Sequence, residues 1–462
     1  MKNTRIEHDL LGEMEVPAYA YYGIHTLRAL ENFPISGIQI NAYTSLIRSL
    51  AFVKHACALA NLQFGALESN KVNPIVEACI KIEDGRFHDQ FVVDVIQGGA
   101  GTSTNMNANE VIANIGLELL NLEKGNYSRL HPLEDVNKSQ STNDVYPTAI
   151  KIALNMEIQL LDNAMDVLIK AFESKAAEFS HILKVGRTQL QDAVPMTLGQ
   201  EFKTYAIMLR EDQQRLREAT RLIEEINLGA TAIGTGITAP KGYSAVVCNI
   251  LSELTGIALI PAENLIEATQ DAGAFVQLSG VLKRIAVKLS KTCNDLRLLS
   301  SGPRTGFNEI NLPPVQAGSS IMPGKVNPVI PEVVNQIAFE VIGNDMTITM
   351  AAEAGQLQLN AFEPIIARNL FNSINFLKQG CLTLAKKGVI GITANETHLK
   401  DLFDNSISMI TALNPIIGYE KATFVAKESF RTGRSVKSIL LENKILNEDE
   451  IDKAFSIDNL IK

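Results

Sequence analysis

Long runs of apolar residues spaced three and four positions apart dominate the middle of this chain of 462 residues. Such spacing places the apolar side chains on one face of an α-helix. We therefore expect three long helices, over about residues 147–172, 202–226 and 275–299. Their apolar positions are Leu154, Ile158, Leu161, Met165, Leu168 and Phe172; Phe202, Tyr205, Leu209, Leu216, Ala219, Ile223 and Ile226; and Phe275, Leu278, Leu282, Ile285, Leu289, Leu296 and Leu299.

Two more long helices are expected over about 332–354 and 365–387, beside Pro331 and Pro364, because proline suits the first turn of a helix. Sustained seams of this kind pack at small crossing angles, so the five helices predict a bundle. Apolar residues also lie off the main seams, which predicts burial on more than one side and assembly of several chains. A monomeric bundle wrapped by the ends of the chain is the alternative.

On either side of the bundle the sequence shows only shorter helical patterns. This change predicts three domains in a mainly α fold. Residues 1–140 are expected to form a mostly helical N-terminal domain, with helix-like stretches near 42–62 and 72–85. Residues 141–395 carry the long helices, and residues 396–462 form a small C-terminal helical domain.

Composition excludes several classes of function. A net charge of −9 argues against a nucleic-acid or anionic-membrane surface, although an anionic small substrate is compatible with it. No window approaches the roughly 20 apolar residues of a membrane span, and the start of the chain has no apolar targeting segment. Five cysteines and seven histidines show no ligand spacing, so we expect a cytoplasmic protein with reduced thiols and no metal site.

Polar loops next to the expected helices are the candidate functional segments. GGAGTSTNMN at 98–107 nearly matches a dinucleotide-binding pattern, but Thr104 stands where its third glycine should fall. SQSTND at 139–144 is either a simple helix cap or a set of donors for a carboxylate. GRTQLQD at 186–192 either connects two helices or contributes to a site.

The fourth loop lies in a segment that proline keeps out of helices and central strands. Residues 302–331 include GSSIMPGKVN at 318–327, which combines hydroxyl, amide and cationic side chains. Loops this long are usually functional or disordered, and apolar residues within the segment favour order. The segment contains six prolines, namely Pro303, Pro313, Pro314, Pro323, Pro328 and Pro331.

GSSIMPGKVN resembles the signature of the fumarase/aspartase superfamily, with each of its fixed positions present. The resemblance extends over essentially the whole chain, since other blocks match in the same order. These blocks are GAGTSTNMNANE at 99–110, NKSQSTNDVYPT at 137–148, GRTQLQDAVPMTLGQE at 186–201 and NLGATAIGTG at 227–236. The resemblance implies a three-domain, mainly α fold with a central bundle of five long helices.

Within the superfamily the N-terminal text, residues 332–345 and residues 351–360 are most similar to the aspartase branch. That branch removes ammonia reversibly from L-aspartate to give fumarate, through loss of a Cβ proton and an enediolate intermediate. Gln189 stands where class II fumarases carry histidine, which favours ammonia over water. A class II fumarase and a catalytically silent, crystallin-like structural protein are the alternatives; argininosuccinate and adenylosuccinate lyases match the other blocks poorly.

The resemblance also implies roles for residues of this chain. Ser319 would be the general base, its alkoxide stabilised by Lys325 and backbone N–H groups of the loop, whose Gly318 and Gly324 would serve as hinges. No cofactor is implied, and divalent-cation activation is not readable from the sequence. The implied assembly is a homotetramer whose active sites draw loops from three subunits. The implied substrate contacts are Thr102, Ser141, Thr142 and Ser320 with the β-carboxylate, Lys325, Asn327 and Thr188 with the α-carboxylate, and Asn143 and Gln189 near the amino group.

Overall fold

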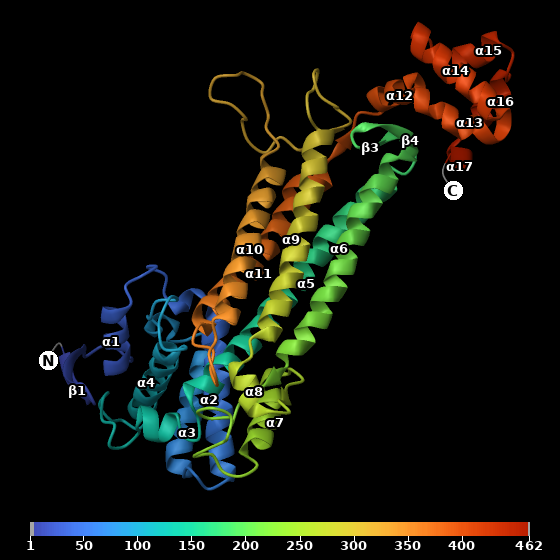
Figure 1. Ribbon diagram of the computed structural model, residues 1–462. Coiled ribbons are helices and arrows are strands. Elements are labelled where there is room, and N and C mark those ends of the chain that lie inside the picture. The colour runs from blue at the N-terminus through green and yellow to red at the C-terminus, as the bar shows by residue number, and fades with distance from the viewer. Residues whose placement is uncertain (1–3, 461–462) are drawn as a thin grey trace. The chain divides into compact units, whose positions relative to one another are not determined.

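The computed structural model describes residues 4–460, apart from the side chain of Asp458. These residues form mostly α-helix, and their strands pair only into small two-stranded sheets (Figure 1). The mainly α fold class predicted from the sequence is therefore confirmed.

The chain divides into two compact units, and the boundaries between them fall inside helices rather than in loops. The predicted division into three domains at residues 140 and 395 stays a prediction, because these two compact units are defined by contacts and do not test it. Unit 1 consists of Met1–Asp162, Gln214–Arg284 and Glu340–Leu377, and unit 2 of Asn163–Gln213, Ile285–Phe339 and Lys378–Lys462.

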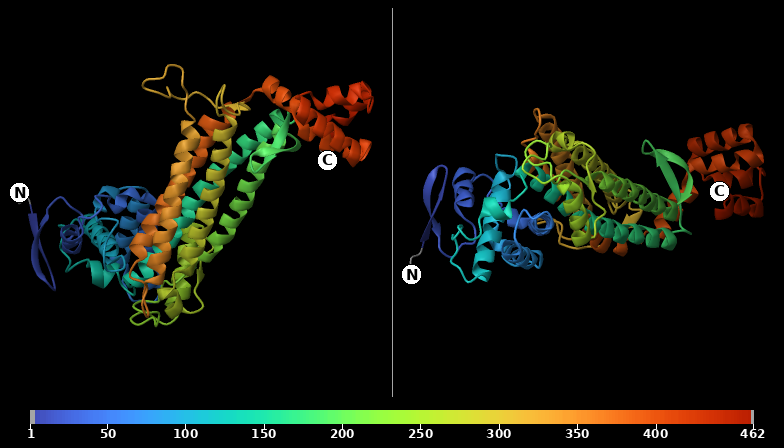
Figure 2. Two further views of the ribbon diagram at one scale, coloured as in Figure 1. Left: turned by 45° about the horizontal axis from the view of Figure 1, so that its top comes forward. Right: turned by 90° about the horizontal axis from the view of Figure 1, so that it is seen from below.

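All five predicted long helices are present. Within each unit, their segments lie side by side (Figure 1, Figure 2). The predicted seam residues of α5, α6 and α9 are buried. A polar residue interrupts the seam once in α6, at Asp212, and once in α9, at Thr292, and both are buried as well. Lys288 lies 2.9 Å from the Asp212 carboxylate, so the buried charge in unit 2 has a counter-ion. The helices are α5 (Thr142–Glu178), α6 (Leu198–Thr220), α9 (Gly273–Leu299), α10 (Val329–Glu353) and α11 (Glu363–Thr383).

The boundaries of α5 and α6 depart furthest from the prediction. α5 begins at Thr142, so Pro147 lies inside the helix rather than in its first turn. Proline has no N–H for the carbonyl four residues earlier, which belongs to Asn143. Asn227 supplies the missing donor, since its Nδ2 lies 3.0 Å from that oxygen. The periodic run in α6 continues past the helix end into a short turn and the strand β5 (Glu225–Ile226).

Unit 1 surrounds its part of the long helices with shorter elements. The hairpin β1–β2 near the start of the chain was not expected, whereas helices over 42–62 and 72–85 were, and α2 and α3 confirm them within a few residues. The elements are β1 (Thr4–Asp9), β2 (Gly12–Pro17), α1 (Ile24–Asn32), α2 (Thr44–Gln63), α3 (Ser69–Glu83), α4 (Thr102–Leu119), α7 (Tyr243–Thr255), β6 (Ile260–Pro261) and α8 (Leu265–Gln270).

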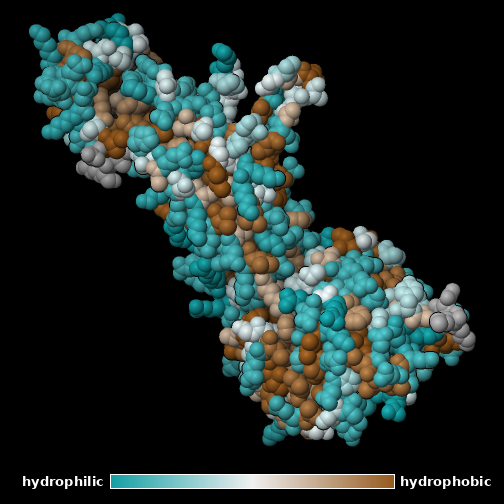
Figure 3. Space-filling view, turned by 180° about the vertical axis from the view of Figure 1, so that it is seen from behind, coloured by the Kyte–Doolittle hydropathy of each residue, from teal (hydrophilic) through white to brown (hydrophobic). Residues whose placement is uncertain are grey.

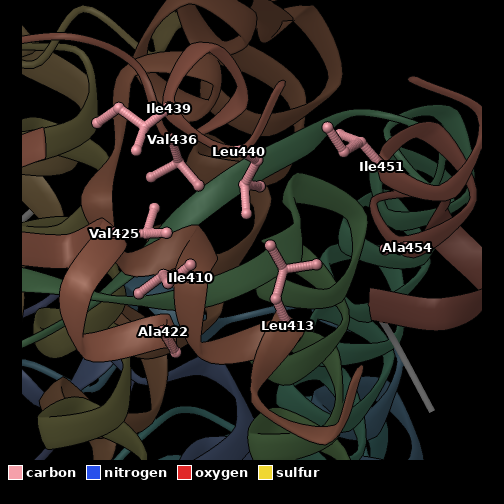
Figure 4. Packing of buried hydrophobic residues seen from close by; sticks show 9 residues of the cluster. All are labelled: Ile410, Leu413, Ala422, Val425, Val436, Ile439, Leu440, Ile451 and Ala454. Atoms are coloured by element: carbon pink, nitrogen blue, oxygen red, sulfur yellow. The ribbon is translucent and has the colours of Figure 1, made fainter. Parts of the chain in front are cut away.

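Unit 2 contains an antiparallel hairpin and a group of C-terminal helices. These helices share a small apolar core in which Val425, Ile439 and Leu413 are fully buried, and Figure 4 shows its side chains converging. The elements are β3 (Leu183–Thr188), β4 (Gln191–Thr197), β7 (Ile310–Asn311), β8 (Thr393–Ala394), α12 (Glu396–Asn405), α13 (Ile410–Ile417), α14 (Tyr419–Thr432), α15 (Val436–Glu442), α16 (Glu448–Ala454) and α17 (Ile457–Leu460).

The surface carries apolar side chains among hydrophilic ones, as the face in Figure 3 shows. On α10, Phe339, Met346 and Met350 are each more than 60% exposed. None of the helices in residues 4–460 combines the length and the hydropathy needed to cross a membrane.

Candidate active site

The loop of residues 318–327 is closed at its base by two hydrogen bonds. Gly318 N donates to Lys325 O at 2.9 Å, and Asn327 Nδ2 donates to Gly318 O. A Cβ atom on Gly318 would lie 2.4 Å from Lys325 O, so this close approach requires glycine. We name residues 318–327 the serine loop; its glycine hinges stay a prediction.

Ser319 is held inside this loop by backbone N–H groups. Its Oγ accepts from Met322 N at 2.9 Å and from Ile321 N at 3.2 Å. Both contacts place partial positive charge beside the oxygen, and such charge stabilises an alkoxide more than a neutral hydroxyl. The loop therefore provides the electrostatic setting that a basic serine needs.

The other predicted residues of the serine loop lie at its surface. Ser320 and Lys325 are exposed, and Asn327 is half-buried at the base of the loop. The structure thus keeps Ser319, Ser320, Lys325 and Asn327 on one short segment of unit 2.

Thr188 and Gln189 lie at the exposed tip of the β3–β4 hairpin, also in unit 2. Gln189 and Leu190 have φ angles of 53° and 63°, so both central residues of the turn are left-handed. Two-residue turns of this handedness match the twist of paired strands. The turn therefore places Gln189 beyond the end of the sheet, next to Thr188, the last paired residue of β3.

Buried charges hold this hairpin against the segment that leads toward the serine loop. Glu309 is 1% exposed, and its carboxylate pairs with Lys184 Nζ at 2.6 Å and with Arg187. The Arg187 guanidinium also lies over the ring of Phe307, 4.4 Å from its centroid. Removing one member would leave a buried charge without its partner, so these contacts fix the base of the hairpin.

Thr102 is the first residue of α4, in unit 1, and its side chain is exposed. The preceding Gly101 has a φ of 88°, and a Cβ on it would lie 2.4 Å from the ring of Tyr146. Glycine at 101 therefore lets the backbone pass close to Tyr146 of α5, directly before the N-terminus of α4.

Ser141 directly precedes α5, and Thr142 and Asn143 begin it, all in unit 1. Asp144 fixes this segment from behind. The Asp144 carboxylate accepts from the backbone N–H groups of Ser141 at 3.0 Å, Thr231 at 2.8 Å and Gly229 at 3.1 Å. Burial raises the pKa of Asp144 to about 6, although these three bonds act to lower it. Asp144 therefore joins the start of α5 to the loop of residues 229–231.

Lys54, on α2, is fully buried and contacts the residues that precede α5. Its Nζ donates to Asn137 Oδ1 and to Gln140 Oε1, both at 2.8 Å. Burial lowers the pKa of Lys54 to about 7. Amide oxygens thus solvate this ammonium group in place of water.

The predicted site residues therefore form two groups, one in each unit. Sequence reasoning missed the supporting residues Lys54, Asp144 and Glu309. A lysine within the apolar text of α2 was a signal for the first of them. Among the described residues, no group of three or more His, Cys, Asp or Glu side chains is arranged to hold a metal ion.

Comparison with known proteins places this geometry in a family. A family model described as lyase matches residues 12–343, and one described as fumarase C C-terminus matches residues 409–462. The chain belongs to this lyase family. The serine loop, the 98–107 loop, the 139–144 loop and the β3–β4 hairpin all lie within the first match.

Curated relatives in the family span the full chain. An aspartate ammonia-lyase of Pseudomonas fluorescens is 58% identical over 99% of this chain and 96% of its own length. An aspartate ammonia-lyase of Helicobacter pylori strain 26695 is 56% identical over 99% of this chain and 98% of its own length. That of Escherichia coli K12 is 55% identical over 99% of this chain and 96% of its own length.

Solved structures of the family have the same fold. A fumarate lyase:delta crystallin from Brucella melitensis, bound to cobalt, matches with a TM-score of 0.96 at 53% identity, covering 99% of both chains. A class II fumarase from Schistosoma mansoni matches with a TM-score of 0.91 at 33% identity, covering 98% of both. The predicted family fold is confirmed.

Proposed function

We propose that this chain is an aspartate ammonia-lyase, which eliminates ammonia reversibly from L-aspartate to give fumarate. The observation that carries the proposal is the pair of backbone N–H groups on Ser319 Oγ, within a family whose full-length relatives are named for this activity.

The difficult step is removal of a proton from Cβ, because the neighbouring carboxylate is already ionised. The Ser319 alkoxide takes that proton and becomes a hydroxyl, while the former β-carboxylate becomes an enediolate with two negative charges. The N–H groups of Ile321 and Met322 stabilise the base before the transfer, and the cation of Lys325 lies on the same loop. The enediolate then expels ammonia as the double bond forms.

Stabilising the enediolate is the largest demand of the reaction. Thr102, Ser141 and Thr142 lie at the N-termini of α4 and α5, where backbone N–H groups and helix dipoles favour an anion. We assign these residues, with Ser320, to the β-carboxylate. Lys325, Asn327 and Thr188 are assigned to the α-carboxylate, and Asn143 and Gln189 to the amino group.

The competing activity within the family is hydration of fumarate. An assay that follows the ultraviolet absorbance of fumarate separates the two. With this protein, consumption of fumarate should require ammonia and should yield L-aspartate. Consumption at the same rate without ammonia, yielding malate, would identify a fumarase instead.

We also propose a homotetramer in which each active site takes loops from three subunits. α5 has 37 residues, which corresponds to about 55 Å of helix. The start of α5 and the hairpin that follows its end supply the two groups of predicted site residues, and we propose that different copies of the chain bring these groups together. The exposed apolar residues of α10, namely Phe339, Ile342, Met346 and Met350, suit contact with other copies.

Shared sites predict recovery of activity in mixed tetramers. Ser319→Ala and Thr188→Ala variants, each nearly inactive, should regain up to about a quarter of wild-type activity after unfolding and refolding together, because random mixing restores some complete sites. Each variant refolded alone is the control. If verified mixed tetramers stay inactive, the two loops belong to sites within one chain.

The proposed chemistry uses only this chain's side chains and backbone N–H groups, so no cofactor is part of it. We place the enzyme in the cytoplasm, where the five buried and unpaired cysteines would stay reduced.

A further inference from the structure

Buried and half-buried side chains behind the start of α5 form a continuous chain of hydrogen bonds that ends at Thr142. Lys54 Nζ donates to Asn137 Oδ1 at 2.8 Å, and Asn105 Nδ2 approaches the same oxygen at 3.2 Å. The Asn105 nitrogen also lies 3.0 Å from Thr142 Oγ1. Lys54 is 0% exposed, Asn105 1% and Thr142 9%, whereas Asn137 is half-buried. All four residues belong to unit 1.

The donor and acceptor of each bond are set by neighbouring groups that can only donate or only accept. Asn137 Nδ2 donates to the carbonyl of Gln140 at 3.3 Å, so its Oδ1 must face Lys54. Gln140 Nε2 donates to the carbonyls of Val136 and Lys138, both at 3.0 Å, so its Oε1 must face Lys54 as well. Amide nitrogen and oxygen are distinguished by such partners. Lys54 therefore donates to both side chains.

The direction set at Asn137 passes to Asn105. Because Asn137 Oδ1 is an acceptor, Asn105 must turn its Nδ2 toward it, and the same nitrogen reaches Thr142. In this orientation Asn105 Oδ1 is buried with no hydrogen-bond partner among the described residues. An unpaired buried acceptor costs stability, so the neighbouring groups impose an orientation that Asn105 alone does not favour.

This orientation decides what Thr142 can offer to a ligand. A hydroxyl group has one proton. Since Thr142 Oγ1 accepts from Asn105, its proton remains available for an acceptor outside the cluster. A carboxylate only accepts, so it needs that proton.

We propose that Lys54 and Asn105 are positioning residues that make Thr142 a hydrogen-bond donor to the substrate carboxylate. The inference rests on the proposed function, because it assigns Thr142 to that carboxylate. With a carboxylate at position 105, Thr142 would donate its hydroxyl proton to that carboxylate. Only a lone pair of Thr142 Oγ1 would then face the substrate.

Asn109 offers a matched control. It lies one turn along α4 from Asn105, is equally buried, and its Nδ2 also approaches Asn137 Oδ1, at 3.3 Å. The second partner of its nitrogen is the sulfur of Met106, where Asn105 has Thr142. Asn105→Asp and Asn109→Asp therefore add the same charge to the same cluster, and only the first reverses the bond to Thr142.

The test measures KM for L-aspartate and the dissociation constant of succinate, an unreactive dicarboxylate, by calorimetry. Asn105→Asp should raise both at least about tenfold, because a hydrogen bond to a charged group is lost. Asn109→Asp should raise them less than about twofold. Lys54→Met, which frees Asn137 and Asn105 to rotate, should act in the same direction as Asn105→Asp. Melting temperatures of all three variants report their cost in stability separately.

A double-mutant cycle isolates the role of Thr142. In a Thr142→Val background, Asn105→Asp should change the succinate dissociation constant less than about twofold. Equal effects in both backgrounds, or an equal effect of Asn109→Asp, would show simple charge repulsion and overturn the inference. A wild-type protein that binds succinate but does not convert aspartate would contradict the proposed function alone. Failure to bind succinate and to convert L-aspartate would overturn both.

Discussion

The 137–144 loop and the serine loop are assigned to the same substrate but are built in opposite ways. The first is held from behind by buried side chains of α2 and α4 and by Asp144. The second is exposed, and the hydrogen bonds of Gly318 and of the Ser319 side chain join residues of the loop to one another. Under the proposed function, this difference predicts carboxylate contacts that are preformed at the first loop and a base that is carried by a mobile loop at the second.

The largest expected effect tests the chemical half of this comparison. Ser319→Ala should lower kcat about a thousandfold, because a general base contributes a factor of that order. Stability in urea should change by less than about 0.5 kcal/mol, because the loop lies at the surface. Steady-state kinetics and urea unfolding measure both. Retention of near-wild-type kcat would mean that another group removes the Cβ proton.

A second prediction tests the anchored half. Asp144→Ala leaves three backbone N–H groups without their acceptor, so the free energy of unfolding should fall by about 2 kcal/mol. Asp144→Asn, which keeps one acceptor oxygen, should lose less. Urea unfolding at neutral pH gives both values. If Asp144→Ala were as stable as Ser319→Ala, the two loops would not differ in their anchoring.

The most gradual expected effect is a dependence of stability on pH. Burial lowers the pKa of Lys54 from 10.5 to about 7, so between these values the folded protein binds fewer protons than the unfolded chain. Stability from this group therefore rises with pH across that window, by at most about 1.4 kcal/mol per pH unit. Lys54→Met should flatten the slope in urea unfolding at several pH values. Lys325→Met controls for the loss of one positive charge, and an unchanged slope in Lys54→Met would mean that Lys54 keeps its charge when buried.

Periodicity predicted the long helices because burial of one helix face depends only on local spacing. Leu161, Leu168 and Leu282 are fully or almost fully buried, as their positions in the seams require. The position of Pro147 within α5 could not be predicted, because the donor that makes it tolerable comes from Asn227, far along the chain. The serine loop was recognisable from its residue types and its resemblance, yet the two N–H groups on Ser319 Oγ depend on the turn that the backbone adopts.

By itself, the sequence determined a mainly α protein of five long helices, its family, and the segments that carry hydroxyl, amide and lysine side chains. These properties follow from spacing and residue type within short stretches. Only the tertiary structure decided which buried groups support those segments. Lys54, Asn105 and Thr142 lie on three different helices, and the direction of a hydrogen bond between them is fixed by contacts that no local pattern encodes.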